Sequence, residues 1–281
     1  MPLISPLLWV VATPLGNPGD LSPRAKEILA EVDAVLAEDT RRAARLCSGH
    51  GIQPRRLLSF FEHNEEKRTR EALGLLKAGS SLALISDAGT PLLADPGYRL
   101  VRACRKEGIP VSPLPGPSAP AAALSVAGIP PLPYTFLGFL PRDDAGQKLL
   151  FTAFAATPGA LVFFERRDRL KTSLAAALEI LGPRELAVCR ELTKIHEEFI
   201  LTRLERVDEV PDELLGELTI IIGPPERTER LSEGDVRRLI AAESATGRSS
   251  LKPRELARHL RDAARGWSVK EIYALLTENK T

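Results

Sequence analysis

The sequence predicts an α/β protein, because short apolar runs alternate with segments of helical pattern through its first half. Five apolar runs of strand type, each followed by a helical segment, lie at 7–12, 35–37, 57–61, 81–85 and 109–113. Strands and helices that alternate in this way form a parallel sheet covered on both faces. After the proline-rich stretch Pro130–Pro133, the strand patterns are more closely spaced. This spacing favours a second, mixed or antiparallel sheet.

Changes of composition divide the chain into three predicted domains. Residues 1–130 form an N-terminal α/β domain, 131–225 a second α/β domain, and 226–281 a small helical domain. The last domain contains helical patterns at about 233–245, 253–265 and 269–280. Because a tight Gly266–Trp267 link joins the final two, they resemble a helix-turn-helix.

Overall composition excludes several classes of protein. The net charge is only +1, so any nucleic-acid site must be a local patch. The last part of the chain is such a patch, with eight Lys/Arg and four Asp/Glu between Arg248 and Lys280. Three isolated cysteines argue against a disulfide scaffold and a structural zinc site. No signal segment or membrane-length apolar run is visible, and we expect a cytoplasmic protein without a membrane partner.

The chain is organised around the loop Ser86–Gly97, which follows a buried strand and leads into a helix. Asp95 and Pro96 predict the N-cap and first turn of that helix. Ligands bind at the carboxyl edge of such sheets, although the loop also fits a simple turn. Gly89 allows close backbone approach, and Asp87 at the strand tip suits a ribose hydroxyl or an ammonium group. Since no G-x-G-x-x-G or P-loop pattern occurs, a cofactor would be held by several strand-end loops.

The sequence of this loop, SDAGTPLLADPG, resembles the central motif of the tetrapyrrole methylase-like superfamily. The resemblance is strongest to its ribosomal branch, the ribosomal RNA small subunit methyltransferase I family. Other segments match in the same order along the chain: VATPLGN at 11–17, LAEDTR at 36–41, FFEHNE at 60–65, LPGPS at 114–118, GFLP at 138–141 and RELTK at 190–194. One position departs from the family pattern, because Arg166 stands where a small hydroxyl residue usually follows Glu165.

The resemblance implies that S-adenosyl-L-methionine binds between the two α/β domains. Carried over by motif, the cofactor-binding residues are Leu15, Asp87, Gly89, Thr90, Ser118, Ala119, Phe164, Leu192 and Gly223. It also implies 2′-O-methylation of a decoding-site cytidine in 16S ribosomal RNA, within the 30S subunit, by a homodimer. The alternatives are a C-methyltransferase of corrin or porphyrin precursors and a non-catalytic RNA-binding ribosome-assembly factor. The basic helical tail speaks against the first alternative, and an intact cofactor cleft would speak against the second.

Transfer to a ribose hydroxyl requires a group that removes a proton. The candidates at strand ends are Glu38, Asp39, His63 and Glu65, and the sequence does not decide among them. Each also fits a simpler role, as a charge at a helix N-terminus or as a capping or surface residue.

Basic residues at two places are expected to bind RNA phosphates. They are Arg41 and Lys194 in the family motifs, and Lys252, Arg254, Arg258, Arg261 and Lys270 in the helical tail. The spacing of Arg254, Arg258 and Arg261 puts them on one helix face. Leu256 and Leu260 would then pack against the last helix, through Ile272, Leu275 and Leu276.

Overall fold

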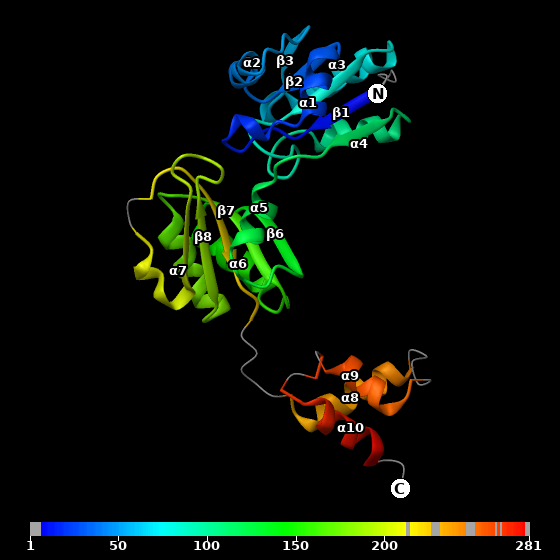
Figure 1. Cartoon of the computed structure of the whole chain (residues 1–281), viewed down its shortest axis with the longest axis vertical. Coiled ribbons are helices and arrows are strands. Elements are labelled where there is room, and N and C mark those ends of the chain that lie inside the picture. Colours follow the sequence, from blue (N-terminus) through cyan, green and yellow to red (C-terminus); the bar gives the residue numbers. More distant parts are fainter. Residues whose placement is uncertain are drawn as a thin grey trace. The chain divides into compact units, whose positions relative to one another are not determined.

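The computed structural model describes residues 7–211, 214–225, 231–245, 251–261, 263–264 and 266–278. The chain divides into two compact units, one up to Pro225 and one from Glu226 (Figure 1). The first unit contains two five-stranded sheets, and the described part of the second contains three helices. No helix in the described ranges is long and apolar enough to cross a membrane.

The first sheet is entirely parallel, with the strand order β3-β2-β4-β1-β5. Its strands are β1 (Leu7–Val11), β2 (Ala34–Ala37), β3 (Leu57–Ser59), β4 (Ser81–Ile85) and β5 (Val111–Leu114). The intervening helices are α1 (Pro23–Glu31), α2 (Thr40–Gly49), α3 (Glu65–Lys77), α4 (Tyr98–Lys106) and α5 (Ala119–Val126), with short 3₁₀ turns at Pro18–Asp20 and Glu62–Asn64. Alternate strand residues face opposite sides, so Trp9 packs with α1 and α2 while Leu8 packs with α3 and α4. The predicted parallel α/β architecture is confirmed.

The second sheet is mixed, as the close spacing of its strands predicted. Its order is β6-β7-β10-β8-β9, in which only the β6–β7 pair is parallel. The strands are β6 (Tyr134–Phe139), β7 (Ala160–Arg166), β8 (Glu185–Arg190), β9 (Glu198–Arg203) and β10 (Glu217–Ile222). Helices α6 (Asp144–Phe154) and α7 (Leu170–Leu181), with the 3₁₀ segment Leu204–Glu209, pack on one face. Helix α5 packs on the other.

The start of α4 differs from the prediction that Asp95 is its N-cap. The N-cap is Gly97, whose φ of 132° is strained for any residue with a side chain. A Cβ at this position would lie 2.6 Å from Cδ2 of Leu84. The cap is instead provided by Glu65 of α3, whose Oε1 accepts hydrogen bonds from the N–H groups of Gly97 (2.9 Å) and Arg99 (3.4 Å). A carboxylate near two free N–H groups also suits the positive end of the helix dipole.

The second unit consists of α8 (Glu233–Ala245), α9 (Pro253–Leu260) and α10 (Val269–Glu278). Leu256 and Leu260 pack with Ile272 and Leu275 of α10, and the partly buried Leu276 joins them, as the leucine spacing predicted. The final helix begins with a capping box, in which Ser268 and Glu271 exchange hydrogen bonds. Helix α9 ends at Leu260, earlier than the predicted 265, and the predicted end of α10 at 279–280 lies outside the described residues.

A buried arginine joins the ends of α6, α7 and β10. Arg184 is only 2% exposed and forms no ion pair with a carboxylate of the described residues. Its guanidinium donates to the carbonyl oxygens of Leu181 (3.2 Å), Ala155 (2.8 Å) and Gly223 (3.4 Å). Leu181 and Ala155 stand at the C-terminal ends of α7 and α6, where helix dipoles favour a cation. Burial nevertheless lowers the pKa of Arg184.

We predict that Arg184→Met lowers the free energy of unfolding by about 2–4 kcal/mol, because it leaves buried carbonyl groups without donors. Urea denaturation followed by circular dichroism measures the change. Arg206→Met, at an exposed arginine, is the matched control and should change the free energy by less than about 0.5 kcal/mol. Equal effects of the two substitutions would show that the buried hydrogen bonds add nothing.

Candidate functional site

A cavity of about 600 Å³ is lined by residues of both sheets of the first unit. From the first sheet come the loops that follow β1, β2, β4 and β5 at their carboxyl ends. From the second come the ends of β6 and β7 and the beginning of β10. Of the predicted site residues, the cavity brings together Leu15, Glu38, Asp87, Gly89, Thr90, Ser118, Ala119 and Phe164. Several strand-end loops therefore build the site jointly, which is the arrangement expected without a glycine-rich fingerprint.

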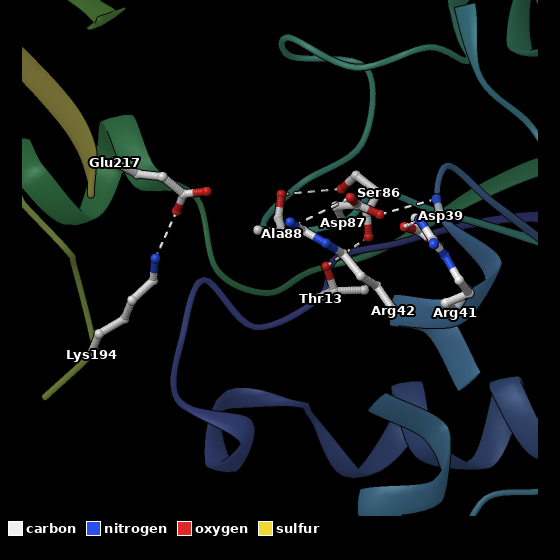
Figure 2. Close-up of polar contacts among 9 residues, drawn as sticks. All are labelled: Thr13, Asp39, Arg41, Arg42, Ser86, Asp87, Ala88, Lys194 and Glu217. Carbon is white, nitrogen blue, oxygen red and sulfur yellow. Dashed lines mark hydrogen bonds and ion pairs between the residues drawn. The ribbon is translucent and has the colours of Figure 1, made fainter. Parts of the chain in front are cut away.

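Backbone hydrogen bonds fix the loop after β4 to the loop after β1. Thr13 and Gly89 form an antiparallel bridge, with N–H···O distances of 2.9 and 3.0 Å. The Thr13 hydroxyl also donates to the carbonyl of Ser86 (3.2 Å) (Figure 2). Gly89 has φ +76°, and a Cβ there would lie 3.1 Å from Cδ2 of Leu15. Leu92 has φ 74°, which is costly for a residue with a side chain, so this loop stores strain beside the cavity.

Three carboxylates gather on the wall from the first sheet: Glu38, Asp87 and Asp95. Asp87 is held from both sides, since Oδ1 accepts the N–H of Asp39 (3.1 Å) and Oδ2 lies 3.3 Å from Nη1 of Arg42 (Figure 2). Burial, reinforced by the negative charge of Asp87, raises the pKa of Asp95 to about 6. Burial and the charges of Asp95 and Asp87 also raise the pKa of Glu38. Carboxylates with raised pKa values in a cavity are typical of functional sites.

The opposite wall includes a turn after β7 that is anchored by a buried carboxylate. Glu165 accepts hydrogen bonds from the hydroxyl of Ser173 (2.6 Å), the guanidinium of Arg169 (3.1 Å) and the N–H of Arg166 (2.8 Å). Arg169 also donates to the carbonyl oxygen of Pro141 (2.6 Å). These bonds fix the backbone of the turn and leave the side chain of Arg166 exposed.

Lys194 is part of a polar cluster next to this wall. Its ammonium lies 2.9 Å from Oε1 of Glu191. It also lies 2.9 Å from Oε2 of Glu217, a residue that lines the cavity (Figure 2). Burial lowers the pKa of Lys194, but the two carboxylates outweigh it and the net pKa is raised. Its aliphatic stem fills the space at Gly16, where a Cβ would lie 2.2 Å from Cγ of the lysine. The N–H of Asn17 donates to the neighbouring Thr193 (3.1 Å), so this cluster connects the two α/β parts.

Several predicted residues lie outside the cavity. Asp39 accepts the N–H of Arg41 and pairs with its guanidinium (2.8 Å), which holds the pKa of Asp39 well below its usual range. His63 is exposed and lies edge-on to Phe61, with 6.3 Å between ring centroids. Glu65 caps α4. The exposed Arg41, in turn, is occupied locally by Asp39.

The predicted cofactor residues Leu192 and Gly223 also do not line the cavity. Leu192 is buried in the same apolar cluster as Leu15 and Ala119, which do line it. Gly223 follows the far end of β10, where its N–H donates to the carbonyl of Glu185 (2.8 Å). The beginning of β10 meets the cavity instead, because this strand runs antiparallel to β7.

Among the cavity residues that were not predicted as site residues, Asp95 and Arg167 carry charge that no described ion pair neutralises. The sequence pattern indicates Asp95 only as a helix cap and gives Arg167 no role. The burial that raises the pKa of Asp95 depends on long-range packing that the sequence pattern does not contain. The same holds for the anchoring of the turn that carries Arg167.

The sequence profile of the family described as Tetrapyrrole (Corrin/Porphyrin) Methylases matches residues 7–208. The chain belongs to this family.

Among curated relatives, a ribosomal RNA small subunit methyltransferase I from Micromonospora olivasterospora is 40% identical, covering 94% of this chain and 86% of its own. One from Thermotoga maritima is 43% identical, covering 78% of this chain and 99% of its own. The chain is thus a member of the ribosomal RNA small subunit methyltransferase I group. Its fold is shared by the uroporphyrin-III C-methyltransferase of Thermus thermophilus, solved in complex with S-adenyl homocysteine. That structure has a TM-score of 0.56 and 21% identity, and the match covers 79% of this chain and 99% of that one.

We predict that Asp95→Asn stabilises the protein near neutral pH. The native state retains the Asp95 proton up to about pH 6, whereas the ordinary pKa is 3.8, so the ionised carboxylate destabilises the fold above this window. The substitution should raise the free energy of unfolding by about 1–2 kcal/mol at about pH 7, after a discount for solvent screening. The gain should shrink as the pH falls toward about 4.5. Urea denaturation at both pH values measures it, with the exposed Asp208→Asn as control; a gain that does not depend on pH would contradict the assignment.

Proposed function

We propose that the protein transfers the methyl group of S-adenosyl-L-methionine to the ribose 2′-hydroxyl of a decoding-site cytidine in 16S ribosomal RNA. We further propose that it recognises this RNA within the 30S subunit, acts as a homodimer, and works in the cytoplasm. The observation that carries the proposal is the carboxylate-lined cavity formed by the family motifs. It occurs in a chain that is 40% and 43% identical to proteins named ribosomal RNA small subunit methyltransferase I.

The residues of the cavity fit S-adenosylmethionine by their charge and by their apolar surfaces. Glu38, Asp87 and Asp95 provide negative charge for a molecule with a sulfonium and an ammonium group. Leu15 and Phe164 offer apolar surfaces for an adenine ring. The proposed binding set therefore comprises Leu15, Asp87, Gly89, Thr90, Ser118, Ala119 and Phe164. Leu192 would act indirectly, by packing behind Leu15, and Gly223 has no part in this set.

When bound, S-adenosylmethionine supplies an activated methyl group on a positively charged sulfur. The residues of the chain must then align the acceptor hydroxyl and remove its proton. Of the four candidate bases, Glu38 is the one that lines the cavity. We therefore propose that its carboxylate accepts the proton of the ribose hydroxyl. Its raised pKa makes it a stronger base than an ordinary glutamate. Arg42, on the same wall, forms an ion pair with Asp87, and Asp39 forms one with Arg41.

The basic face of α9 suits the phosphates of a large RNA. Arg254, Arg258 and Arg261 are exposed and form no ion pair within the part of the chain that the structure describes. Lys252 and Lys270 are exposed as well. By contrast, Arg41 and Lys194 already pair with carboxylates, and RNA would have to compete with them.

Parallel assays of radiolabelled methyl transfer test the proposal. The acceptors are 30S subunits, free 16S RNA and a corrin or porphyrin precursor, followed by mapping of the modified nucleotide. Methylation of a decoding-site cytidine ribose supports the proposal, and methylation of the tetrapyrrole alone would replace it with C-methyltransferase activity. If calorimetry detects no binding of S-adenosylmethionine, the role is that of a non-catalytic assembly factor. Light scattering of the same preparation should give the mass of a dimer.

We predict that Glu38→Gln lowers kcat by about 10²–10⁴-fold, because the acceptor hydroxyl loses its base. In the unsubstituted protein, kcat should fall as the pH drops through the pKa of Glu38, which lies above its ordinary value of 4.5. Single-turnover methyl transfer across pH measures both effects. His63→Gln and Glu65→Gln are the controls and should keep kcat within about threefold of the unsubstituted value. A loss with His63→Gln as large as that with Glu38→Gln would move the assignment to the histidine.

We predict that replacing Arg254, Arg258 and Arg261 together with Gln weakens RNA binding and leaves cofactor affinity unchanged. Each lost phosphate contact should reduce the slope of log affinity against log salt by about 0.7–0.9. Filter binding at several salt concentrations measures the slope, and calorimetry measures the cofactor. A matched triple variant of exposed arginines in the first unit, Arg24, Arg45 and Arg102, controls for net charge. If both triple variants lose equal affinity, the face of α9 is only solvated surface.

A further inference from the structure

The cavity has a second wall, from which the proposed function uses only Phe164. The turn after β7 puts Arg166 and Arg167 on the cavity wall opposite Glu38, Asp87 and Asp95. We propose that the Arg166–Arg167 turn binds the phosphodiester backbone of the substrate RNA beside the nucleotide that enters the cavity, and that Phe139 stacks on a base of that RNA. This inference rests on the proposed function and adds to it the place where the substrate enters.

The first argument is that one of the arginines lining the cavity forms no ion pair with a described residue. Arg42 pairs with Asp87 and Arg166 pairs with Asp168, at 3.3 and 3.2 Å. Arg167 is exposed, lines the cavity and forms no ion pair with any residue that the structure describes. It is therefore available to an anion from outside, and an RNA phosphate is the anion that a methylase of ribosomal RNA meets.

The second argument is that the turn is rigid. Glu165 is fully buried and binds the N–H of Arg166, while Arg169 is tied to Glu165 and to the carbonyl of Pro141. Two exposed guanidinium groups thus project from a backbone that is fixed on both sides. A fixed backbone lowers the entropy lost when these side chains bind a phosphate.

The third argument is an exposed aromatic ring on the same wall. Phe139 lines the cavity and is 59% exposed, although it is a large apolar residue. Phe164, which also lines the cavity, packs against it with 5.3 Å between ring centroids, and Phe136 lies 5.0 Å from Phe164. An aromatic platform beside cationic side chains is how proteins hold unpaired nucleotides. The acidic wall would then face the cationic methyl donor and the basic wall the anionic acceptor.

The test uses the full-length protein and the RNA or 30S acceptor that it methylates. Arg167→Ala should raise KM about tenfold with little change in kcat, and reduce the salt slope of RNA binding by about 0.7. Phe139→Ala should weaken RNA binding to a similar extent without changing the salt slope, because stacking releases no counterions. Both variants should bind S-adenosylmethionine as the unsubstituted protein does. Arg206→Ala, at an exposed arginine of the same sheet region, is the matched control and should change neither quantity.

A further variant is expected to strengthen RNA binding instead of weakening it. Asp168→Asn removes the carboxylate that occupies Arg166, so RNA should bind more tightly and with a steeper salt slope. If Arg167→Ala and Asp168→Asn both match the control while the unsubstituted protein methylates RNA, the inference is wrong and the proposed function stands. If Phe139→Ala weakens cofactor binding instead, the ring belongs to the cofactor and the stacking assignment fails. If the unsubstituted protein methylates no RNA, the proposed function falls, and this inference with it.

Discussion

The antiparallel bridge between Thr13 and Gly89 is the constraint on which the site depends. It joins the loops that leave two neighbouring strands, β1 and β4, so neither loop moves without the other. The bridge brings Leu15 against Gly89 and holds Asp87 at the tip of β4, where Arg42 and the N–H of Asp39 complete its contacts. The strain at Leu92 can persist because the loop is held on both sides of it, by the bridge at Gly89 and by the hydrogen bond from the N–H of Gly97 to Glu65.

The charged residues around the cavity show how a chain of net charge +1 can present an acidic wall and a basic wall in one site. Most charged residues around the cavity neutralise one another, as in the pairs Lys194–Glu217 and Arg169–Glu165. The charged residues that form no ion pair among the described residues lie on different walls of the cavity. Glu38 and Asp95 lie on the wall from the first sheet, and Arg167 lies on the wall from the second. Local imbalance of this kind gives selectivity without a large net charge, because fields in a cavity are focused by its low-dielectric walls.

The sequence predicted the elements well because their signals are local. Apolar runs located the strands, and the leucine spacing located the packing of α9 against the last helix. The sequence-based prediction failed at the start of α4, where Asp95–Pro96 is a better local cap than Gly97. The N–H groups at this end are capped by Glu65, which lies 32 positions before Gly97 in the chain. The same long-range packing turns Asp95 from an expected cap into a cavity residue with a raised pKa. Contacts between distant segments leave no trace in the spacing of one sequence.

Strand direction explains why Gly223, a predicted cofactor residue, does not line the cavity. In the first sheet every strand is parallel, so residues at the carboxyl ends meet at one edge, and the strand-end residues Glu38 and Asp87 both line the cavity there. The rule does not extend to β10, which runs antiparallel to β7 and offers the cavity its first residues. Gly223, at its far end, is held by Glu185 and by the buried Arg184 instead. The order of residues along the sequence does not show which end of a strand meets the cavity; the direction of the strand in the sheet decides it.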